Sequence, residues 1–409
     1  MAIVKPFSCV RPTKELVADV AALPYDVYSS AEARAFVAEH PQSFLAIDRA
    51  ETAFPEGTDM YSKEVYEKAS SLLQDWISNG TFVRDEEKCY YLYELTMNGR
   101  AQTGIVACVS IDDYVNDVVK KHENTRADKE QDRINHIKAC GAQTGPIFLT
   151  YKAVASIQEM VASVKEEEAL YDFTSEDGIR HRVFRIANGE QIAYLEQAFN
   201  EIPNVYIADG HHRAASAVRA GLDLRAQAGT YTGEEDFNYF LSVLFPDEEL
   251  LILDYNRVVK DLNGMTDEEF LQQVEEFFDV IPVPSRMKPT KKGDFTMYLS
   301  GTWYLCRIRE DIEIDPIESL DVSILQNYLL APILGIKDPK TDNRIAFVGG
   351  VRGLRELERR CISECKVAFA LYPATIQELF EVADAGLLMP PKSTWFEPKL
   401  RSGIFIHEI

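Results

Sequence analysis

The sequence lacks long apolar segments, an excess of basic residues and any signal for export, and each absence excludes a class of protein. No apolar run approaches membrane-spanning length, and no basic stretch leads into an apolar core near Met1. Acidic residues outnumber basic ones by 66 to 43, which gives a formal charge of −23. Because such a surface repels a polyanion, we expect neither membrane insertion nor general binding to nucleic acid.

The seven cysteines form no recognisable disulfide or metal framework. They are odd in number, scattered along the chain and never spaced as a CxxC pair. Cys361 and Cys365 lie one helical turn apart, but no second His or Cys pair accompanies them, so we expect both to pack in a core. This cysteine usage indicates a reducing compartment and predicts a cytoplasmic protein.

The length and the hydrophobic content of the chain predict two domains. A chain of 409 residues, 46% of them hydrophobic, is long enough for two separate cores. Helical and strand patterns alternate along its whole length, which predicts a mixed α/β, or α+β, architecture. We place the boundary after the apolar strand Tyr239–Phe245, so the expected domains are residues 1–245 and residues 246–409.

Turn and cap signals locate individual elements. Ser29 followed by Glu32 predicts a capped helix start, and Asn98-Gly99 predicts the turn of a β-hairpin. Asn188-Gly189 is interpreted in the same way, as the turn between two strands. Gly221 is expected to end an alanine-rich helix in the middle of the chain.

The most informative pattern is a strand that runs into a glycine and then into a helix. The strand 204–208 is followed by Asp209-Gly210 and by a helix that begins at His212. Such a junction directs free backbone N–H groups and the positive end of the helix dipole at one point, which suits a phosphate. Gly210 lets an anion approach the backbone, and Arg213 can hold two phosphate oxygens at once. Asp209 would repel a phosphate unless it held a metal ion or acted on the substrate, and a divalent cation such as Mg²⁺ would reconcile the acid with the phosphate.

The alternative interpretation of this segment is a plain strand-to-helix turn. Gly210 would then serve only the backbone geometry, and the two histidines after it would be surface polar groups. Two adjacent histidines among only seven in the chain, flanked by Asp209-Gly210 and Arg213, favour the functional interpretation.

The same residues carry a resemblance to known families. Ala208-Asp209-Gly210-His211-His212-Arg213 resembles the glycine-histidine-arginine phosphate motif of the ParB/sulfiredoxin superfamily, and the free serine kinase branch is the nearer match. Over nearly its whole length the chain also resembles a large bacterial family that is usually left uncharacterised or labelled ParB-like. The segments that carry this second resemblance are Leu23-Pro24-Tyr25-Asp26-Val27, Lys121-His122-Glu123-Asn124-Thr125, Asp209 to Arg213, and Met389-Pro390-Pro391-Lys392-Ser393-Thr394 with Pro398-Lys399.

The resemblance implies a ParB/sulfiredoxin-like nucleotide-binding core with insertions in residues 1–245, followed by an additional mixed α/β domain. It also implies that nucleotide phosphates rest on the backbone around Gly210 and on His212 and Arg213. Sulfiredoxins have a nucleophilic cysteine where this chain has His211, so reduction of a sulfinic acid is not expected. Chromosome-partitioning relatives carry a Glu-Arg-Arg signature and a helix-turn-helix, and neither is recognisable in this sequence.

Phosphoryl transfer needs a phosphate cradle, usually a metal ion, a base for the hydroxyl and cations for the developing charge. The candidate catalytic residues are Asp26, Glu123, Asp209 and His211, with Asp26 or Glu123 as the base and Asp209 as the metal ligand. The candidate nucleotide-binding residues are Lys121, Gly210, His212, Arg213, Lys392, Ser393, Thr394 and Lys399. ATP or ADP and Mg²⁺ are the expected cofactors.

Three of these segments have plainer interpretations that the sequence leaves open. Asp26 lies in a Pro-Tyr-Asp turn signature and can simply hydrogen-bond its own backbone. Lys121-His122-Glu123 lies in a charged stretch that can be solvated surface. The segment 390–394 can be an exposed turn, although a Lys-Ser-Thr cluster beside Trp395 also suits a phosphate or a stacked base.

The leading hypothesis is a kinase that transfers phosphate from ATP or ADP to a small hydroxyl metabolite, with serine preferred, or that runs in reverse from phosphoserine. A nucleotide-responsive binding module that hydrolyses its nucleotide slowly is the second hypothesis. A ParB-like DNA-associated protein is the third, and the acidic charge disfavours it. The sequence leaves open whether the chain forms a homo-oligomer.

Overall fold

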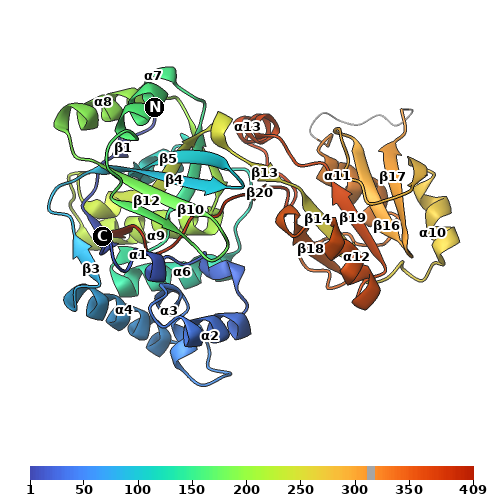
Figure 1. The fold of residues 1–409 in the computed structure, drawn as a ribbon, viewed down its shortest axis with the longest axis horizontal. Helices are drawn as coiled ribbons and strands as arrows, with labels where there is room; N and C mark the ends of the chain where they lie inside the picture. Colours follow the sequence, from blue (N-terminus) through green and yellow to red (C-terminus); the bar gives the residue numbers. More distant parts are fainter. Residues whose placement is uncertain (311–317) are drawn as a thin grey trace. The chain divides into compact units, whose positions relative to one another are not determined.

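The computed structural model describes residues 1–310 and 318–409. These residues form two compact units: unit 1 comprises Met1–Leu250 with Pro398–Ile409, and unit 2 comprises Leu251–Glu397. Each unit combines helices with β-sheet (Figure 1), which confirms the predicted mixed α/β fold class. In the order of the chain, unit 2 is an insertion into unit 1.

Unit 1 contains a large mixed sheet with the strand order β6-β11-β8-β12-β5-β4-β10-β9 and with β1 beside β5. The pairs β6–β11 and β8–β12 are parallel, whereas the other neighbouring strands are antiparallel. The parallel pairing of β6 with β11 brings the residues that follow both strands to the same edge of the sheet. The strands are β1 (Val4–Lys5), β4 (Tyr90–Met97), β5 (Arg100–Ser110), β6 (Val119–Lys120), β8 (Ile147–Tyr151), β9 (Tyr171–Thr174), β10 (Arg180–Ile186), β11 (Val205–Asp209) and β12 (Tyr239–Pro246).

The helices of unit 1 pack against this sheet and against one another. Helix α9 packs on α6, and α6 packs on α4 (Figure 1). The helices are α1 (Val17–Val20), α2 (Ser30–Glu39), α3 (Leu45–Asp48), α4 (Lys63–Ser78), α5 (Ile111–Val115), α6 (Ala127–Cys140), α7 (Ala155–Val164), α8 (Gly189–Asn200) and α9 (His211–Ala228), with short 3₁₀ turns η1 (Tyr25–Val27), η2 (Ala50–Ala53), η3 (Asp236–Asn238) and η4 (Asp247–Glu249). Over the residues that the structure describes, no helix is long and apolar enough to cross a membrane.

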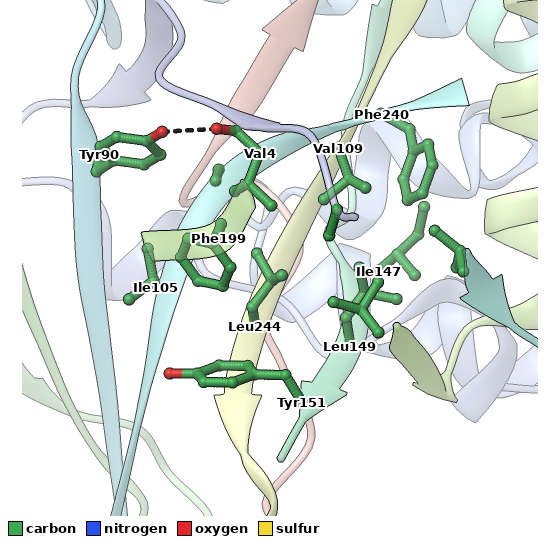
Figure 2. Close-up of a cluster of buried hydrophobic side chains, with 14 of the residues drawn as sticks. Val4, Tyr90, Ile105, Val109, Ile147, Leu149, Tyr151, Phe199, Phe240 and Leu244 are labelled. Carbon is green, nitrogen blue, oxygen red and sulfur yellow. Dashed lines mark hydrogen bonds between the residues drawn. The ribbon is translucent and has the colours of Figure 1, made fainter. Parts of the chain in front are cut away.

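The main hydrophobic core of unit 1 is built on alternate residues of the large sheet. Ile105 and Val109 of β5 share one face of their strand and meet side chains from α7, α8 and α9. Figure 2 shows Phe199 of α8 among these strand residues, and the Tyr90 hydroxyl donates a hydrogen bond to the Val4 carbonyl at 2.7 Å. The one polar atom of the buried Tyr90 side chain is therefore satisfied.

Two predicted local signals are confirmed in unit 1. Asn98 and Gly99, between β4 and β5, have φ values of 52° and 80°. A two-residue type I′ turn requires two such left-handed residues, and Asn-Gly adopts them at little cost. Ser29 is the N-cap of α2 and forms a capping box with Glu32.

A second sheet of unit 1 incorporates the C-terminal segment 398–409. Its strand order is β3-β2-β21-β7, with β2 (Cys9–Pro12), β3 (Phe82–Arg84), β7 (Ala142–Gln143) and β21 (Ile406–Glu408). Strand β21 pairs with β2 on one side and with β7 on the other. Backbone hydrogen bonds on both edges therefore fix the C-terminal segment within unit 1.

Unit 2 is built on an antiparallel sheet with the strand order β15-β17-β16-β19-β14-β18. Cys365 lies in its core and Cys361 packs against that core, as predicted. A separate ribbon pairs β13 (Ile252–Leu253) with β20 (Trp395–Phe396). The other elements are β14 (Tyr255–Val259), β15 (Phe278–Val283), β16 (Asp294–Leu299), β17 (Thr302–Ile308), β18 (Ile345–Gly349) and β19 (Val367–Leu371), with α10 (Asp267–Val274), α11 (Asp321–Leu325), the π-helical turn η5 (Gln326–Leu330), the 3₁₀ turn η6 (Gly350–Arg352), α12 (Leu354–Ser363) and α13 (Ile376–Asp384).

The predicted strand turn at Asn188-Gly189 is wrong. Asn188 is instead the N-cap of α8, where its side-chain oxygen accepts hydrogen bonds from the N–H groups of Glu190 and Gln191. The paired strands β9 and β10 lie before this residue. Asn favours tight turns and helix caps for the same reason, since its short side chain accepts backbone hydrogen bonds.

The predicted helix end at Gly221 is also wrong. Helix α9 continues to Ala228 and ends at Gly229, so Gly221 lies inside it. A Cβ on Gly221 would lie 2.3 Å from the carbonyl oxygen of Phe237 and 3.0 Å from a methyl carbon of Ile111. Gly221 therefore allows α9 to pack closely against these residues and does not end the helix.

We predict that Gly221→Ala destabilises unit 1 even though alanine is the better helix former. The clash with the Phe237 backbone forces a shift that costs about 1–3 kcal/mol, which exceeds the helix-propensity gain of about 1 kcal/mol at the upper end. Urea denaturation followed by circular dichroism measures the change. Gly189→Ala, in the first turn of α8 with open space around the Cβ position, is the matched control and should leave the midpoint unchanged or raise it. An equal effect of the two substitutions would refute the packing argument.

Candidate functional site

A strand, a glycine and a helix meet at Gly210. Strand β11 ends at Asp209, helix α9 begins at His211, and Gly210 between them has φ 93° and ψ 32°. Glycine adopts this left-handed conformation at low cost. An ideal Cβ on Gly210 would also lie 3.0 Å from Nε and Nη2 of Arg213. The bare backbone of Gly210 therefore lets the Arg213 guanidinium lie directly against the junction.

Asp209 is the charged centre of this junction. Its Oδ1 accepts a hydrogen bond from the N–H of Gly210 at 2.9 Å, and its Oδ2 lies 3.1 Å from Nζ of Lys399 and 3.9 Å from Nη2 of Arg213. Burial alone would raise the pKa of Asp209, but the charges of Lys399 and Arg213 lower it well below its ordinary value. Asp209 is therefore ionised at neutral pH, and its side chain, 35% exposed, stays within reach of a ligand.

Arg213 is anchored to the protein along one edge. Its Nη1 donates a hydrogen bond to the carbonyl of Pro146 at 2.6 Å, and its side chain is only 14% exposed. The remaining edge, with Nη2 and Nε, faces Gly210 and Asp209. Arg213 therefore has a structural contact and, on its other edge, donors at the place where a phosphate would lie.

The parallel pairing of β6 with β11 brings Glu123 and His122 beside the start of α9. The imidazole rings of His122 and His211 meet edge to face with centroids 4.4 Å apart. Oε2 of Glu123 lies 4.0 Å from Nδ1 of His211. The predicted catalytic residues Glu123, Asp209 and His211 thus lie at one edge of the sheet.

Both histidines of this pair are buried and uncharged at neutral pH. Burial lowers the pKa of His122 to about 4. Burial also lowers the pKa of His211 well below its ordinary value, and the neighbouring His122 disfavours a second protonated ring beside it. His211 therefore contributes a neutral ring to the site, and the positive charge comes from Arg213 and Lys399.

The remaining predicted residues of unit 1 have other neighbours. Nε2 of His212 accepts a hydrogen bond from the backbone N–H of Arg126 at 3.0 Å. Nζ of Lys121 lies 4.3 Å from the ring centroid of Tyr114 and donates to the Tyr114 carbonyl at 3.4 Å, so its described contacts are with Tyr114 and not with Asp209. Whether His212 and Lys121 also contact a nucleotide stays a prediction.

Asp26 is exposed in the turn η1, directly after the buried Tyr25. Burial raises the pKa of Tyr25 to about 12, and the charges of Arg133, Asp26 and Arg213 all act on its hydroxyl. Asp26 and Arg213 are therefore both within electrostatic reach of one side chain.

Lys392, Ser393 and Thr394 belong to unit 2. Lys392 has a φ of 60°, and its carbonyl accepts a hydrogen bond from Nη2 of the buried Arg257 at 3.0 Å. The Ser393 hydroxyl donates to the Pro390 carbonyl at 2.6 Å. The segment is a turn that is bonded from within unit 2, and its part in a phosphate site stays a prediction.

The sequence analysis missed a cavity of about 30 Å³ that Arg213 borders. Asp48, at the end of α3, and Arg133, within α6, also line it, and these side chains are buried, with residue exposures of 4% and 7%. Tyr25 and Ser402 are also part of its wall. No local motif marks Asp48 or Arg133, whereas Arg213 and the Pro-Tyr-Asp segment, both singled out in the sequence, border this cavity.

Among the described residues, the site contains one carboxylate that is well placed to bind a divalent cation. It does not contain a complete set of metal ligands. No group of three or more His, Cys, Asp or Glu side chains within residues 1–310 and 318–409 is arranged to hold a metal ion. Mg²⁺ in nucleotide sites is commonly bound by one or two carboxylates together with phosphates and water. The ionised Asp209 fits that pattern, so Mg²⁺ bound jointly by Asp209 and a nucleotide stays a prediction.

A family profile described as a protein of unknown function (DUF1015) matches residues 4–323. The chain belongs to this family. The matched region includes the junction around Gly210 and the segment that follows β6. A search of curated proteins found no match.

The chain is also distantly similar to several solved structures. A free serine kinase in complex with AMP is 14% identical, with a TM-score of 0.36 and coverage of 72% of this chain and 91% of that one. A conserved hypothetical protein from Pyrococcus furiosus is 14% identical, with a TM-score of 0.35 and coverage of 73% and 94%. C-terminally truncated SbnI from Staphylococcus aureus is 12% identical, with a TM-score of 0.37 and coverage of 72% and 85%.

We predict that the buried histidine His122 makes the protein less stable as the pH falls below neutrality. Because its folded pKa is about 4 and its unfolded pKa is about 6.5, the unfolded state binds more protons between these values. The stability is therefore fully present above pH 6.5 and declines as the pH falls toward 4, by about 2 kcal/mol at pH 5.

Urea unfolding of the wild type and of His122→Asn at pH 8, 7 and 5 tests this prediction. The loss between pH 7 and pH 5 should be smaller in the variant by about 2 kcal/mol, whereas neither protein should change much between pH 8 and pH 7. Parallel pH profiles of the two proteins would show that His122 is not held neutral in the fold.

Proposed function

We propose that the protein binds a nucleotide by its phosphates at the junction of β11 and α9 and transfers a phosphoryl group between that nucleotide and a small hydroxyl compound. The observation that carries this proposal is the convergence of Arg213 and Lys399 on Asp209 at the start of a long helix. Two cations and a helix N-terminus favour a phosphate at the same point.

The backbone at the junction supports phosphate binding. The first intrahelical hydrogen bond of α9 runs from the N–H of Ala214 to the carbonyl of Gly210. The N–H groups of the residues between them point out of the helix end, as at any helix N-terminus. Because Gly210 has no Cβ, the Arg213 guanidinium lies close to this backbone, so an anion at the helix end would meet both the N–H groups and the guanidinium.

In this proposal Asp209 exchanges partners when a nucleotide binds. Its carboxylate is one ligand of Mg²⁺, which shields the charge between carboxylate and phosphate. Lys399 and the free edge of Arg213 then contact phosphate oxygens. Arg213 supplies two parallel hydrogen bonds and Lys399 a point charge.

The transferred group moves from the terminal phosphate of the nucleotide to the acceptor hydroxyl. The acceptor oxygen forms a new bond to phosphorus, the bond from phosphorus to the bridging oxygen breaks, and the nucleotide leaves one phosphate shorter. The hydroxyl proton passes to a carboxylate. We assign that base to Asp26, because Tyr25 next to it lines the cavity that Arg213 also borders, whereas Glu123 lies against His211.

The motif resemblance at 208–213 nominates serine as the acceptor and ATP or ADP as the donor. Binding of a nucleotide without transfer would instead favour a nucleotide-responsive module. The acidic charge of the chain gives a DNA-associated role no support.

Substitution of Arg213 tests the phosphate contact. Arg213→Lys keeps the charge but loses the second parallel hydrogen bond, so nucleotide affinity should fall by about 1.5–3 kcal/mol in isothermal titration calorimetry. The melting temperature of the nucleotide-free protein should fall slightly, because the bond to the Pro146 carbonyl weakens. Arg219→Lys, at an exposed position of the same helix, is the matched control and should change neither quantity. A loss of stability in Arg213→Lys without any loss of affinity would make Arg213 purely structural.

A coupled assay tests the transfer itself and the role of Asp26. The wild type should turn over serine with ATP or ADP, or phosphoserine with AMP or ADP, in the presence of Mg²⁺. Asp26→Asn should lower kcat by about 10²–10⁴-fold and leave nucleotide affinity unchanged, because a general base acts only on the hydroxyl. Glu123→Gln is the companion variant, and a larger loss of kcat in it than in Asp26→Asn would move the base to Glu123. No turnover in either direction would refute serine as the acceptor.

A further inference from the structure

A second cavity of unit 1, with a volume of about 90 Å³, lies where two parallel strands end. Strands β8 and β12 pair in parallel, and their last residues, Tyr151 and Pro246, are partners in the register and both line the cavity. One face of α7, strand β5 and the turn η4 form the rest of the wall. None of the lining residues belongs to the junction around Gly210, so this cavity is a separate candidate site.

The hydroxyl of Tyr151 is a polar group of this wall that has no partner in the described part of the chain. Tyr151 is 1% exposed, and its ring meets Phe199 edge to face with centroids 5.4 Å apart. In Figure 2 the hydroxyl points away from β8, and no residue within 1–310 and 318–409 forms a hydrogen bond with it. Because a buried hydroxyl is costly without a hydrogen bond, the cavity is the place where a ligand would supply one.

Glu249 contributes a carboxylate that forms no ion pair with any described residue. Its Oε2 accepts a hydrogen bond from the N–H of Thr103 at 2.5 Å, and its Oε1 has no described partner. Burial raises the pKa of Glu249 above its ordinary value, although the charges of Lys165 and Arg100 act to lower it. The nearby cations therefore do not fully compensate for the burial of this carboxylate.

The cation in the wall, Lys165, is paired with a different carboxylate. Its Nζ lies 2.5 Å from Oε2 of the buried Glu94. The two charges that act on the hydroxyl of Tyr151 are those of Glu249 and Asp247, and both raise its pKa in addition to the effect of burial. The electrostatic field at this hydroxyl is therefore negative and favours a cation.

The size and the lining of the cavity restrict that cation. A cavity of about 150 Å³ holds the six carbons of benzene, so about 90 Å³ suits about three or four heavy atoms. No described group of three or more His, Cys, Asp or Glu side chains is arranged to hold a metal ion. Ile105, Val161 and Pro246 give the cavity apolar walls, which suit a short alkyl chain.

We propose that this second cavity binds a short primary alkylammonium ion of the size of ethylammonium. The three N–H donors of the ammonium meet three acceptors, namely Oε1 of Glu249, the Tyr151 oxygen and the side-chain oxygen of Gln158. The alkyl group contacts the apolar walls, and Ala162 is exposed at the rim, where the ligand enters. The inference goes beyond the proposed function and does not rest on it.

Saturation-transfer difference NMR on the full chain, at constant ionic strength, tests the class of ligand with four probes. Ethylammonium has the charge, the donors and the size that the cavity requires. Ethanol has the size without the charge, acetate has the opposite charge, and tetramethylammonium has the charge without an N–H donor. Ethylammonium should bind saturably at millimolar concentration, and the other three probes at least about 10-fold more weakly. Equal binding of any other probe, or no binding of ethylammonium, would overturn the inference.

Glu249→Gln and Tyr151→Phe then assign the contacts. Glu249→Gln keeps an acceptor for the Thr103 N–H but removes the charge, so ethylammonium affinity should fall at least about 10-fold. Glu248→Gln makes the same charge change at an exposed neighbour that does not line the cavity, and this matched control should bind as the wild type does. Tyr151→Phe should weaken binding about 3-fold or more and leave the urea midpoint unchanged, because its hydroxyl has no described partner in the protein.

Unchanged ethylammonium affinity in a folded Glu249→Gln protein would refute the site. A lower urea midpoint of Tyr151→Phe with unchanged affinity would show that the hydroxyl is structural, which also contradicts the inference. The wild-type probe series and Tyr151→Phe decide the question if Glu249→Gln fails to fold. Nucleotide affinity should be the same in all these variants, so failure of this inference leaves the proposed function standing.

Discussion

The ion pair between Lys399 and Asp209 is the interaction on which the rest of the site depends. It joins residues 190 positions apart, one at the end of β11 and one in the segment that returns to unit 1 after the whole of unit 2. Without Lys399, the Asp209 carboxylate would face the helix end with only Arg213, 3.9 Å away, as a described cation. The pair therefore gathers one negative and two positive charges within a small volume, which is the arrangement that the proposed metal and phosphate site requires.

The charged and the neutral side chains of this site belong to different residue types. The cations beside Asp209 come from an arginine and a lysine, whereas burial lowers the pKa of His122 and of His211. All seven histidines lie in unit 1, and in unit 2 burial raises the pKa of the Asp321 carboxyl group to about 7.

Local signals in the sequence predicted local structure well, but they did not predict contacts between segments that are far apart in the chain. Asn98-Gly99 and the Ser29 cap are encoded by neighbouring residues, so their turn and helix start were predictable. Gly221 and Asn188 were misinterpreted because glycine and asparagine each serve two roles, and only tertiary packing decides between them. The junction around Gly210 was found from a contiguous motif, whereas the cavity walls come from α3, α6 and the C-terminal segment, which no sequence pattern connects.

The place of unit 2 in the chain also sets an order of assembly on the ribosome. Residues 398–409 are synthesised after both units are otherwise complete, and they carry Lys399, Ser402 and the strand β21. Until they emerge, the nascent chain has Gly210 and Arg213 but lacks the cation of Asp209, part of the cavity wall and the strand that joins β2 to β7. The charges around Gly210 therefore reach their final arrangement only after synthesis has passed unit 2.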